Sequence, residues 1–145
     1  MPLNNLDTEC ALYRQLLDTL GVIIFVKDDD NNIVYANKAA AGTVNVTPAE
    51  MLGTHASQWY EAEECAKFLA NDLDVIHNNR PKLNIIESYT KPDGQKRWLR
   101  TSKYPLNRAD GSPWLLALYA VDVTELMMAQ KAAQPFRPGD PSGDD

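Results

Sequence analysis

The stretch GVIIFVKDDDNNIVYANKAAAG, residues 21–42, holds two short apolar runs on either side of a cluster of Asp and Asn residues. The runs GVIIFVK and NIVYAN are rich in β-branched residues, which favour strands, and Asp and Asn favour turns. The stretch therefore predicts a β-hairpin. The KAAAG that follows predicts a short helix ending at Gly42. Asn37 can accept hydrogen bonds from the free N–H groups at the start of that helix.

Helical patterns lie on both sides of this hairpin. Leucines recur at intervals of three and four residues between Glu9 and Leu20, which predicts a helix with one apolar stripe. The pattern does not separate packing on its own domain from packing on a partner chain. Thr47 and Pro48 fit the N-cap and first position of another helix. The longest predicted helix covers residues 61–77.

Three more strands are predicted in the second half of the chain. KLNIIESYT (82–90) and KRWLRTSKYPL (96–106) flank Asp93-Gly94, a pair typical of a tight hairpin turn. A second Asp-Gly pair precedes WLLALYAVDV (114–123). The short links predict an antiparallel sheet, and helices placed between the second and third strands can cover only one face of it. The fold class is therefore α+β.

This order of elements, and the residues at its joints, resemble the PAS sensory domain of the PAS/PAC family. The stretches that carry the resemblance are residues 21–42, TPAEMLG (47–53), KPDGQKRWLRTSKYPLNRADG (91–111) and YAVDVTE (119–125). The resemblance implies a five-stranded antiparallel sheet in the order 2-1-5-4-3, with helices on one face and often a small pocket between them.

We expect four parts in the chain. They are an N-terminal flanking helix (1–16), a PAS sensory domain (17–123), an output helix (124–133) and a tail (134–145). The tail is rich in Pro, Gly and Asp, a composition that predicts disorder.

The triplet Asp122-Val123-Thr124 matches the Asp-Ile-Thr-like triplet at which the last PAS strand ends and the output helix begins. Asp122 and Thr124 can accept hydrogen bonds from the N–H groups at the helix start. A short, capped joint would move the helix together with the strand, whereas a flexible linker would absorb the shift. We expect Asp122, Val123 and Thr124 to transmit the signal; the plainer interpretation is a helix cap alone.

A pocket on the concave side of the sheet is the default site for a small molecule. Strand alternation and PAS geometry together predict its lining residues. The candidates are Ile24, Val26, Asn37, Trp59, Phe68, Leu69, Ile76, Ile86, Trp98, Arg100, Ser102, Leu116 and Leu118.

Both faces of strand 96–106 are mixed, so the pattern leaves open which face is inward. If the Trp98 face is inward, Arg100 would be a buried cation that needs an anionic ligand. On the open face, Arg100 would instead form a cross-strand pair with Glu87, and we favour this second interpretation.

The sequence argues against two PAS cofactors. The heme-binding class has a ligating His in the long helix, whereas Phe68 stands roughly at that place and residues 61–76 contain no His. The light-oxygen-voltage class has a reactive Cys in an Asn-Cys-Arg-Phe-Leu-Gln stretch that this chain lacks. Flavin held in another way stays open, because Trp59, Tyr60 and Trp98 could flank a ring. No metal-binding or catalytic motif is present, so we expect no enzyme, and the cofactor stays unknown.

Composition narrows the setting of the protein. A chain of 145 residues suits one domain, and its net charge of −6 argues against direct nucleic-acid binding. No apolar run reaches the roughly 18 residues of a membrane span, and the start resembles no signal peptide, so we expect a cytoplasmic protein that does not bind membranes. Apolar positions recur after Asp122, at Leu126, Ala129 and Ala133. The resemblance implies a homodimer through the flanking helices and the open sheet face.

We therefore expect a bacterial sensor module that binds a small ligand or partner and relays a conformational change through its C-terminal helix. The resemblance implies a downstream kinase, cyclase or DNA-binding domain, acting in two-component, cyclic-di-GMP or transcriptional signalling. One alternative is a ligand-free PAS scaffold for dimerisation or protein interaction, which a cavity below a few hundred Å³ would favour. Another is a heme or flavin redox sensor.

Overall fold

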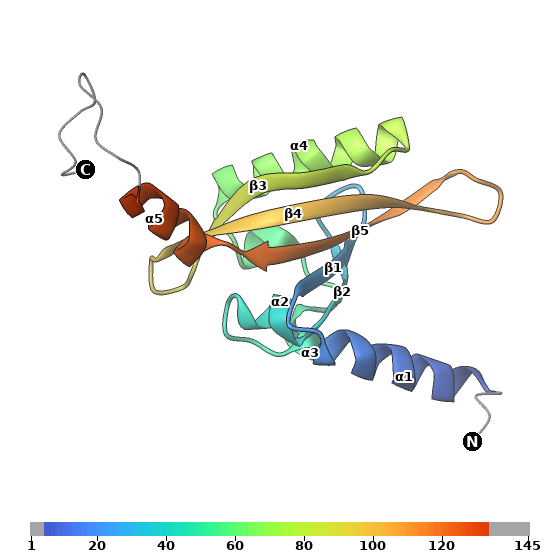
Figure 1. The fold of residues 1–145 in the computed structure, drawn as a ribbon. Helices are drawn as coiled ribbons and strands as arrows, with labels where there is room; N and C mark the ends of the chain where they lie inside the picture. Colours follow the sequence, from blue (N-terminus) through green and yellow to red (C-terminus); the bar gives the residue numbers. More distant parts are fainter. Residues whose placement is uncertain (1–4, 134–145) are drawn as a thin grey trace.

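The computed structural model describes residues 5–133 and contains one five-stranded sheet with helices around it (Figure 1). Before the long helix lie α1 (Leu6–Thr19), β1 (Ile23–Lys27), β2 (Ile33–Ala36), α2 (Lys38–Gly42), α3 (Pro48–Met51) and the 3₁₀ helix η1 (Ala56–Gln58). Then follow α4 (Ala62–Asn78), β3 (Lys82–Thr90), β4 (Lys96–Asn107), β5 (Pro113–Asp122) and α5 (Thr124–Ala133). The predicted disordered tail lies outside the described residues.

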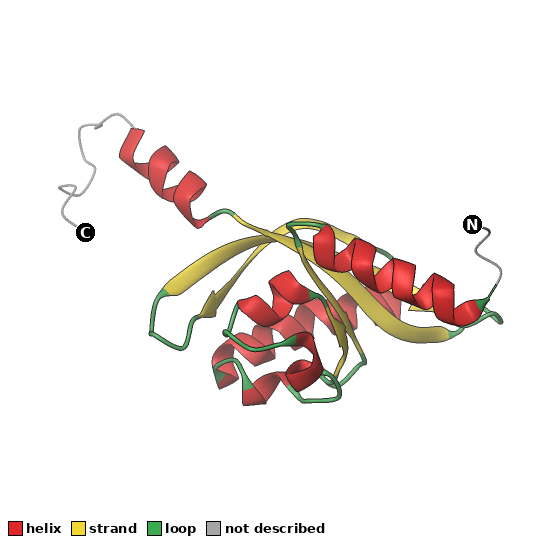
Figure 2. Cartoon of the chain, turned by 90° about the horizontal axis from the view of Figure 1, so that it is seen from below, coloured by secondary structure: helices red, strands yellow, loops and turns green. Residues whose placement is uncertain are grey.

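The strands pair in the order β2-β1-β5-β4-β3, and every pairing is antiparallel. This confirms the predicted fold class and strand order. The sheet curves, and the helices between β2 and β3 gather within its curve (Figure 2). Helices α1 and α5 project away from this body, so they are flanking elements of the domain (Figure 1).

Local sequence explains the helix starts. Thr47 caps α3 with its side chain, and Pro48 occupies the first turn, as predicted. Asn37 caps α2, because its Oδ1 accepts from the N–H of Ala40 at 3.0 Å. The same oxygen accepts from the N–H of Ile24 at 3.0 Å, and the Asn37 amide donates to the carbonyls of Leu17 and Val22. One buried side chain thus joins the end of α1, strand β1 and helix α2.

The core lies between the concave face of the sheet and helices α2 to α4. Its most deeply buried apolar side chains are Ile33, Met51, Val75 and Leu116. Helix α1 behaves differently, because none of its residues is buried. The stability of α1 therefore depends little on the core of its own domain, which is consistent with a partner on its apolar side.

Candidate functional site

A small cavity lies between the concave face of the sheet and helix α4. Its volume is about 40 Å³, enough for about three water molecules. All five strands contribute residues to its wall, each from a single face; β3 contributes Glu87 and Tyr89. The lining residues are Ile23, Phe25, Lys27, Ile33, Thr43, Ala56, Tyr60, Phe68, Glu87, Tyr89, Leu99, Thr101, Lys103, Leu118 and Ala120.

Three buried charges line this cavity, and Asp72 behind them completes a group that we call the buried tetrad, Lys27, Asp72, Glu87 and Lys103. The ammonium of Lys103 lies 2.6 Å from Asp72 Oδ1 and 2.8 Å from Glu87 Oε2. The ammonium of Lys27 lies 2.7 Å from Asp72 Oδ2, an ion pair by distance that lacks hydrogen-bond geometry. The tetrad links β1, α4, β3 and β4 and has equal numbers of positive and negative groups.

The two ammonium groups of the tetrad are not equally satisfied. Lys103 has two carboxylate partners and also donates to the carbonyl of Phe68 at 3.4 Å. Lys27 has only the carboxylate of Asp72 among the described residues, and its ammonium lies 5.6 Å from the centre of the Phe68 ring. Burial lowers the pKa of Lys27, and the attraction of Asp72 offsets this only in part. Lys27 therefore retains donor capacity at the cavity wall.

Hydroxyl groups complete the wall. Thr101 Oγ1 is buried and has no hydrogen-bond partner within residues 5–133. The hydroxyl of Tyr60 lies 2.7 Å from Thr43 Oγ1, which itself donates to the carbonyl of Ala40 at 2.7 Å. Tyr60 must then be the donor to Thr43. Burial raises the pKa of Tyr60, and the Thr43 contact opposes this only weakly, so Tyr60 stays a neutral donor at physiological pH.

The structure brings only two of the predicted pocket residues, Phe68 and Leu118, to the cavity. Strand β1 turns the opposite face inward from the one predicted: Phe25 and Lys27 line the cavity, while Ile24 and Val26 do not. The run IIFV is apolar at every position, so its composition cannot show which alternate residues face the core.

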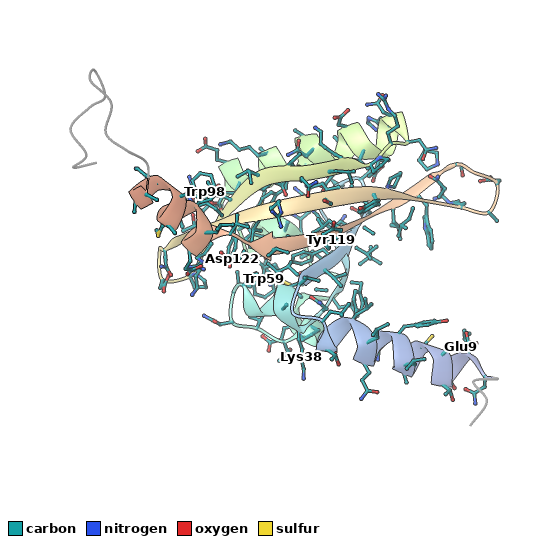
Figure 3. All side chains as sticks on the ribbon, in the orientation of Figure 1. Glu9, Lys38, Trp59, Trp98, Tyr119 and Asp122 are labelled. Carbon is teal, nitrogen blue, oxygen red and sulfur yellow. The ribbon has the colours of Figure 1, made fainter. Side chains whose placement is uncertain are left out.

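The other predicted residues on helices, on loops and on β5 lie elsewhere. Asn37, Ile76 and Leu116 are buried but do not line the cavity, and Leu69 is half-buried on α4 away from it. Trp59 lies on an outer groove, where its indole N–H donates to Thr54 Oγ1 at 2.8 Å (Figure 3).

Strand β4 turns Leu99, Thr101 and Lys103 inward, which settles the orientation that the pattern left open. Trp98, Arg100 and Ser102 are therefore not pocket residues, and neither is the exposed Ile86 on β3. The expected pair between Arg100 and Glu87 is also wrong. Arg100 is exposed and lies in register with Ile86, whereas Glu87 faces inward to Lys103.

A second constellation holds the start of α5 against β4; we call it the corner, Arg97, Trp98, Asp122, Val123 and Thr124. The backbone N–H of Trp98 donates to Thr124 Oγ1 at 2.8 Å, and the N–H of Val123 donates to the carbonyl of Trp98 at 2.8 Å. Asp122 Oδ1 accepts from the N–H of Thr124 at 2.9 Å. Asp122 lies at the junction of β5 and α5 (Figure 3). The predicted cap is therefore present for Asp122, whereas the Thr124 hydroxyl accepts from β4 and not from the helix start.

Ion pairs reinforce the corner. Arg97 Nε donates to Asp122 Oδ2 at 2.8 Å, and Arg97 Nη2 donates to both oxygens of Glu125 at 2.9 Å. Partial burial on its own would raise the pKa of Asp122, but the hydrogen bonds from Arg97 and from the Thr124 backbone outweigh it and lower that pKa. Arg97 was missed by the sequence reasoning, although it directly precedes Trp98 in the strand opposite Asp122.

Large apolar side chains remain exposed on the flanking helices and on the convex sheet face. On α1 and α5 they are Leu6, Leu12, Tyr13, Leu16, Leu126 and Met128. On the sheet they include Leu83, Ile86, Trp114 and Tyr119. Tyr119 stacks on Tyr104 with ring centres 6.2 Å apart. Exposed patches of this kind commonly mark interaction surfaces.

Comparison with known families agrees with this architecture. A family described as "PAS fold" matches residues 17–127. The chain belongs to this family. Within residues 5–133 of the PAS protein, no helix has the length and apolar character needed to cross a membrane. In the same range, no cluster of three His, Cys, Asp or Glu side chains could hold a metal ion.

Relatives of this PAS domain occur in signalling proteins. A diguanylate cyclase of Vibrio cholerae serotype O1 is 25% identical over 122 residues, which are 83% of this chain and 38% of the cyclase. A structure of VqmA bound to DPO has a TM-score of 0.65 at 20% identity, covering 79% of this chain and 56% of that one. A PAS domain from a two-component sensor histidine kinase has a TM-score of 0.64 at 13% identity, covering 81% of this chain and 99% of that domain.

A second VqmA structure, described as a dimer of the Vibrio cholerae protein, has a TM-score of 0.68 at 20% identity and covers 85% of this chain and 53% of that one. The chain therefore spans less than two thirds of the cyclase and of VqmA. The structural likenesses show the shared fold. The setting in which these relatives carry that fold supports a role in sensory input.

Proposed function

We propose that this PAS domain is the sensory input module of a larger bacterial signalling protein. It binds a small molecule at the cavity and passes the resulting shift through the corner to α5. The observation that carries this proposal is the corner itself. The N–H of Trp98 on β4 donates to Thr124 at the start of α5, and Arg97 pairs with Asp122 and Glu125.

The same two strands connect cavity and corner. Strand β4 carries Thr101 and Lys103 to the cavity and Arg97 to the corner, while β5 carries Leu118 to the cavity and Asp122 to the corner. A ligand that displaces these strands would move the start of α5 with them, because hydrogen bonds and ion pairs join the strands to α5 without a flexible linker. The module itself is non-catalytic and cytoplasmic in this proposal, and an attached kinase, cyclase or DNA-binding domain provides the output.

The similar proteins support this role. One is a diguanylate cyclase, one is a PAS domain from a two-component sensor histidine kinase, and VqmA was solved bound to DPO. The exposed leucines of α1, together with the apolar convex face of the sheet, support a homodimer. The VqmA structure described as a dimer also supports a homodimer.

A second candidate function is a ligand-free scaffold that serves only dimerisation or protein interaction. The observation that favours it is the cavity volume of about 40 Å³, which is far below the roughly 300 Å³ at the lower limit of most ligand sites. The sensor function therefore requires that the cavity can enlarge to admit a ligand, whereas the scaffold function does not.

Native mass spectrometry of freshly purified protein tests the sensor against the scaffold. The sensor predicts either a retained molecule, seen as extra mass that disappears on denaturation, or a complex on addition of DPO. It also predicts that binding slows or quickens amide exchange in residues 124–133. A protein that retains nothing, does not bind DPO and still forms a dimer would support the scaffold and contradict the sensor.

A further inference from the structure

Resting on this sensory function, we propose that the cavity and a neighbouring surface groove are two parts of one binding site, separated by the side chain of Tyr60. The ligand class is an uncharged, compact ring compound with a hydrogen-bond acceptor that pairs with Thr101. Neither the groove nor this ligand chemistry was predicted from the sequence.

The groove is open to solvent and has a volume of about 490 Å³. Trp59 and Glu61 line it, as do Thr90 at the end of β3 and Pro92 in the turn after it. Tyr60 lines both this groove and the inner cavity. Rotation of one side chain would therefore join the small inner space to a larger outer one.

The contacts that hold Tyr60 in place are few and uncharged. Its hydroxyl makes one hydrogen bond, to Thr43 Oγ1 at 2.7 Å. Its ring makes edge-to-face contacts with Phe68 and Tyr89, at centre distances of 5.8 and 5.9 Å. After rotation, Thr43 would keep its hydrogen bond to the carbonyl of Ala40, so no buried hydroxyl would be stranded there. Tyr60 thus has the properties of a gate.

Two polar groups at the cavity wall keep unused hydrogen-bond donors, and such donors define what the ligand must offer. Thr101 Oγ1 has no hydrogen-bond partner within the described residues, although the residue is only 1% exposed. The Lys27 ammonium has three donors, and its single oxygen partner there is Asp72. Buried polar groups are normally hydrogen-bonded, so a bound molecule that presents an acceptor to Thr101 would satisfy that hydroxyl.

The charge balance of the tetrad and the apolar walls of the cavity determine the net charge and the shape of the ligand. The buried tetrad is neutral as a whole, with Lys27 and Lys103 against Asp72 and Glu87. An anionic ligand would add a buried charge without a free counter-charge. Aromatic and aliphatic side chains, among them Phe68 and Leu118, form the other walls, which suits a flat apolar body.

Three ring compounds of similar size test this chemistry: acetophenone (neutral acceptor), benzoate (anion) and ethylbenzene (no acceptor). Each is titrated into the full 145-residue chain, and amide chemical shifts are followed by NMR. Acetophenone should shift the amides of Thr101 and Leu118 and bind at least about tenfold more tightly than the other two, because only it offers Thr101 an acceptor without adding charge.

Thr101→Val, which keeps the side-chain shape, should weaken acetophenone binding about three- to tenfold, the loss expected for one hydrogen bond. It should leave ethylbenzene binding unchanged, and Thr19→Val on α1 should change neither. Tyr60→Phe should speed acetophenone entry and release by a similar factor, because it removes the only hydrogen bond of the gate.

The proposal is overturned if benzoate or ethylbenzene binds as tightly as acetophenone, if none of the three binds, or if Thr101→Val has no effect. Unchanged entry rates in Tyr60→Phe would overturn the gate. These outcomes, which would overturn the proposed ligand class or the gate, can be distinguished from failure of the sensory function. A molecule retained in native mass spectrometry would keep the sensor even if all three rings failed. Acetophenone binding without any change in α5 exchange would keep the site and remove the relay.

Discussion

Replacing Lys103 with Met removes the ammonium that joins two carboxylates in the buried tetrad and leaves a side chain of similar length. Lys103 is 0% exposed and lies 2.6 Å from Asp72 and 2.8 Å from Glu87. Without it, Asp72 retains Lys27, and Glu87 retains only the amide of Asn71 at 3.1 Å. Removing one partner of a buried ion pair typically costs about 3–5 kcal/mol. A typical domain has only about 5–15 kcal/mol of stability.

Urea unfolding at pH 7, followed by circular dichroism, measures this loss as a lower midpoint with little change in slope. The control is Lys67→Met, because Lys67 and Glu63 form an exposed pair 3.9 Å apart on α4. That variant should lose less than about 1 kcal/mol. The double variant Lys103→Met/Glu87→Leu should regain about 1–3 kcal/mol, since it also removes the stranded carboxylate. If Lys103→Met costs no more than Lys67→Met, the tetrad does not hold the sheet to α4.

Three further predictions concern the corner, the hub at Asn37 and the flanking helix. The lowered pKa of Asp122 means that its contribution to the corner is complete above its ordinary pKa of 3.8 and is lost as the pH falls through the lowered value. Amide exchange of residues 124–133 should quicken as the pH falls through that range. Asp122→Asn should abolish this pH dependence of exchange. Asn37→Ala leaves buried backbone groups of β1 and α1 without hydrogen-bond partners and should lower the free energy of unfolding in urea by about 2–4 kcal/mol. A loss of stability below about 1 kcal/mol would contradict the role of Asn37. Leu16→Glu, at a side chain 54% exposed on α1, should turn a dimer into a monomer in light scattering; a wild-type protein that is already monomeric would refute the dimer.

Much of the fold follows from local sequence. Thr47-Pro48 and Asn37 set helix starts, and the Asp-Gly pair at Asp93 marks a hairpin, because caps and turns depend on neighbouring residues alone. The strand order is different, since it depends on long-range pairing. It came from the resemblance to PAS domains, which is carried by several short motifs in the correct order.

The site could not be predicted in the same way. The charges of the tetrad are separated by up to 76 positions, from Lys27 to Lys103, and a Lys in a sequence normally indicates an exposed position. One signal was present in the sequence: Lys103 falls on the same strand face as Leu99 and Thr101, and Lys27 falls on the same strand face as Ile23 and Phe25. Inner faces that carry a Lys on the two strands flanking β5 would have predicted a shared buried anion.

The central claim is that the corner transmits movement of the sheet to α5, and amide hydrogen exchange of Asp122→Ala tests it most directly. The variant loses the pair with Arg97 and the cap on the Thr124 N–H. The matched control is Asp110→Ala, because Asp110 caps the Ser112 N–H in a hairpin turn away from α5. Exchange after residue 124 should quicken about 2- to 30-fold, the range expected for a lost cap, while residues 98–106 stay unchanged. Equal loosening of both regions, or no change in either, would contradict the account.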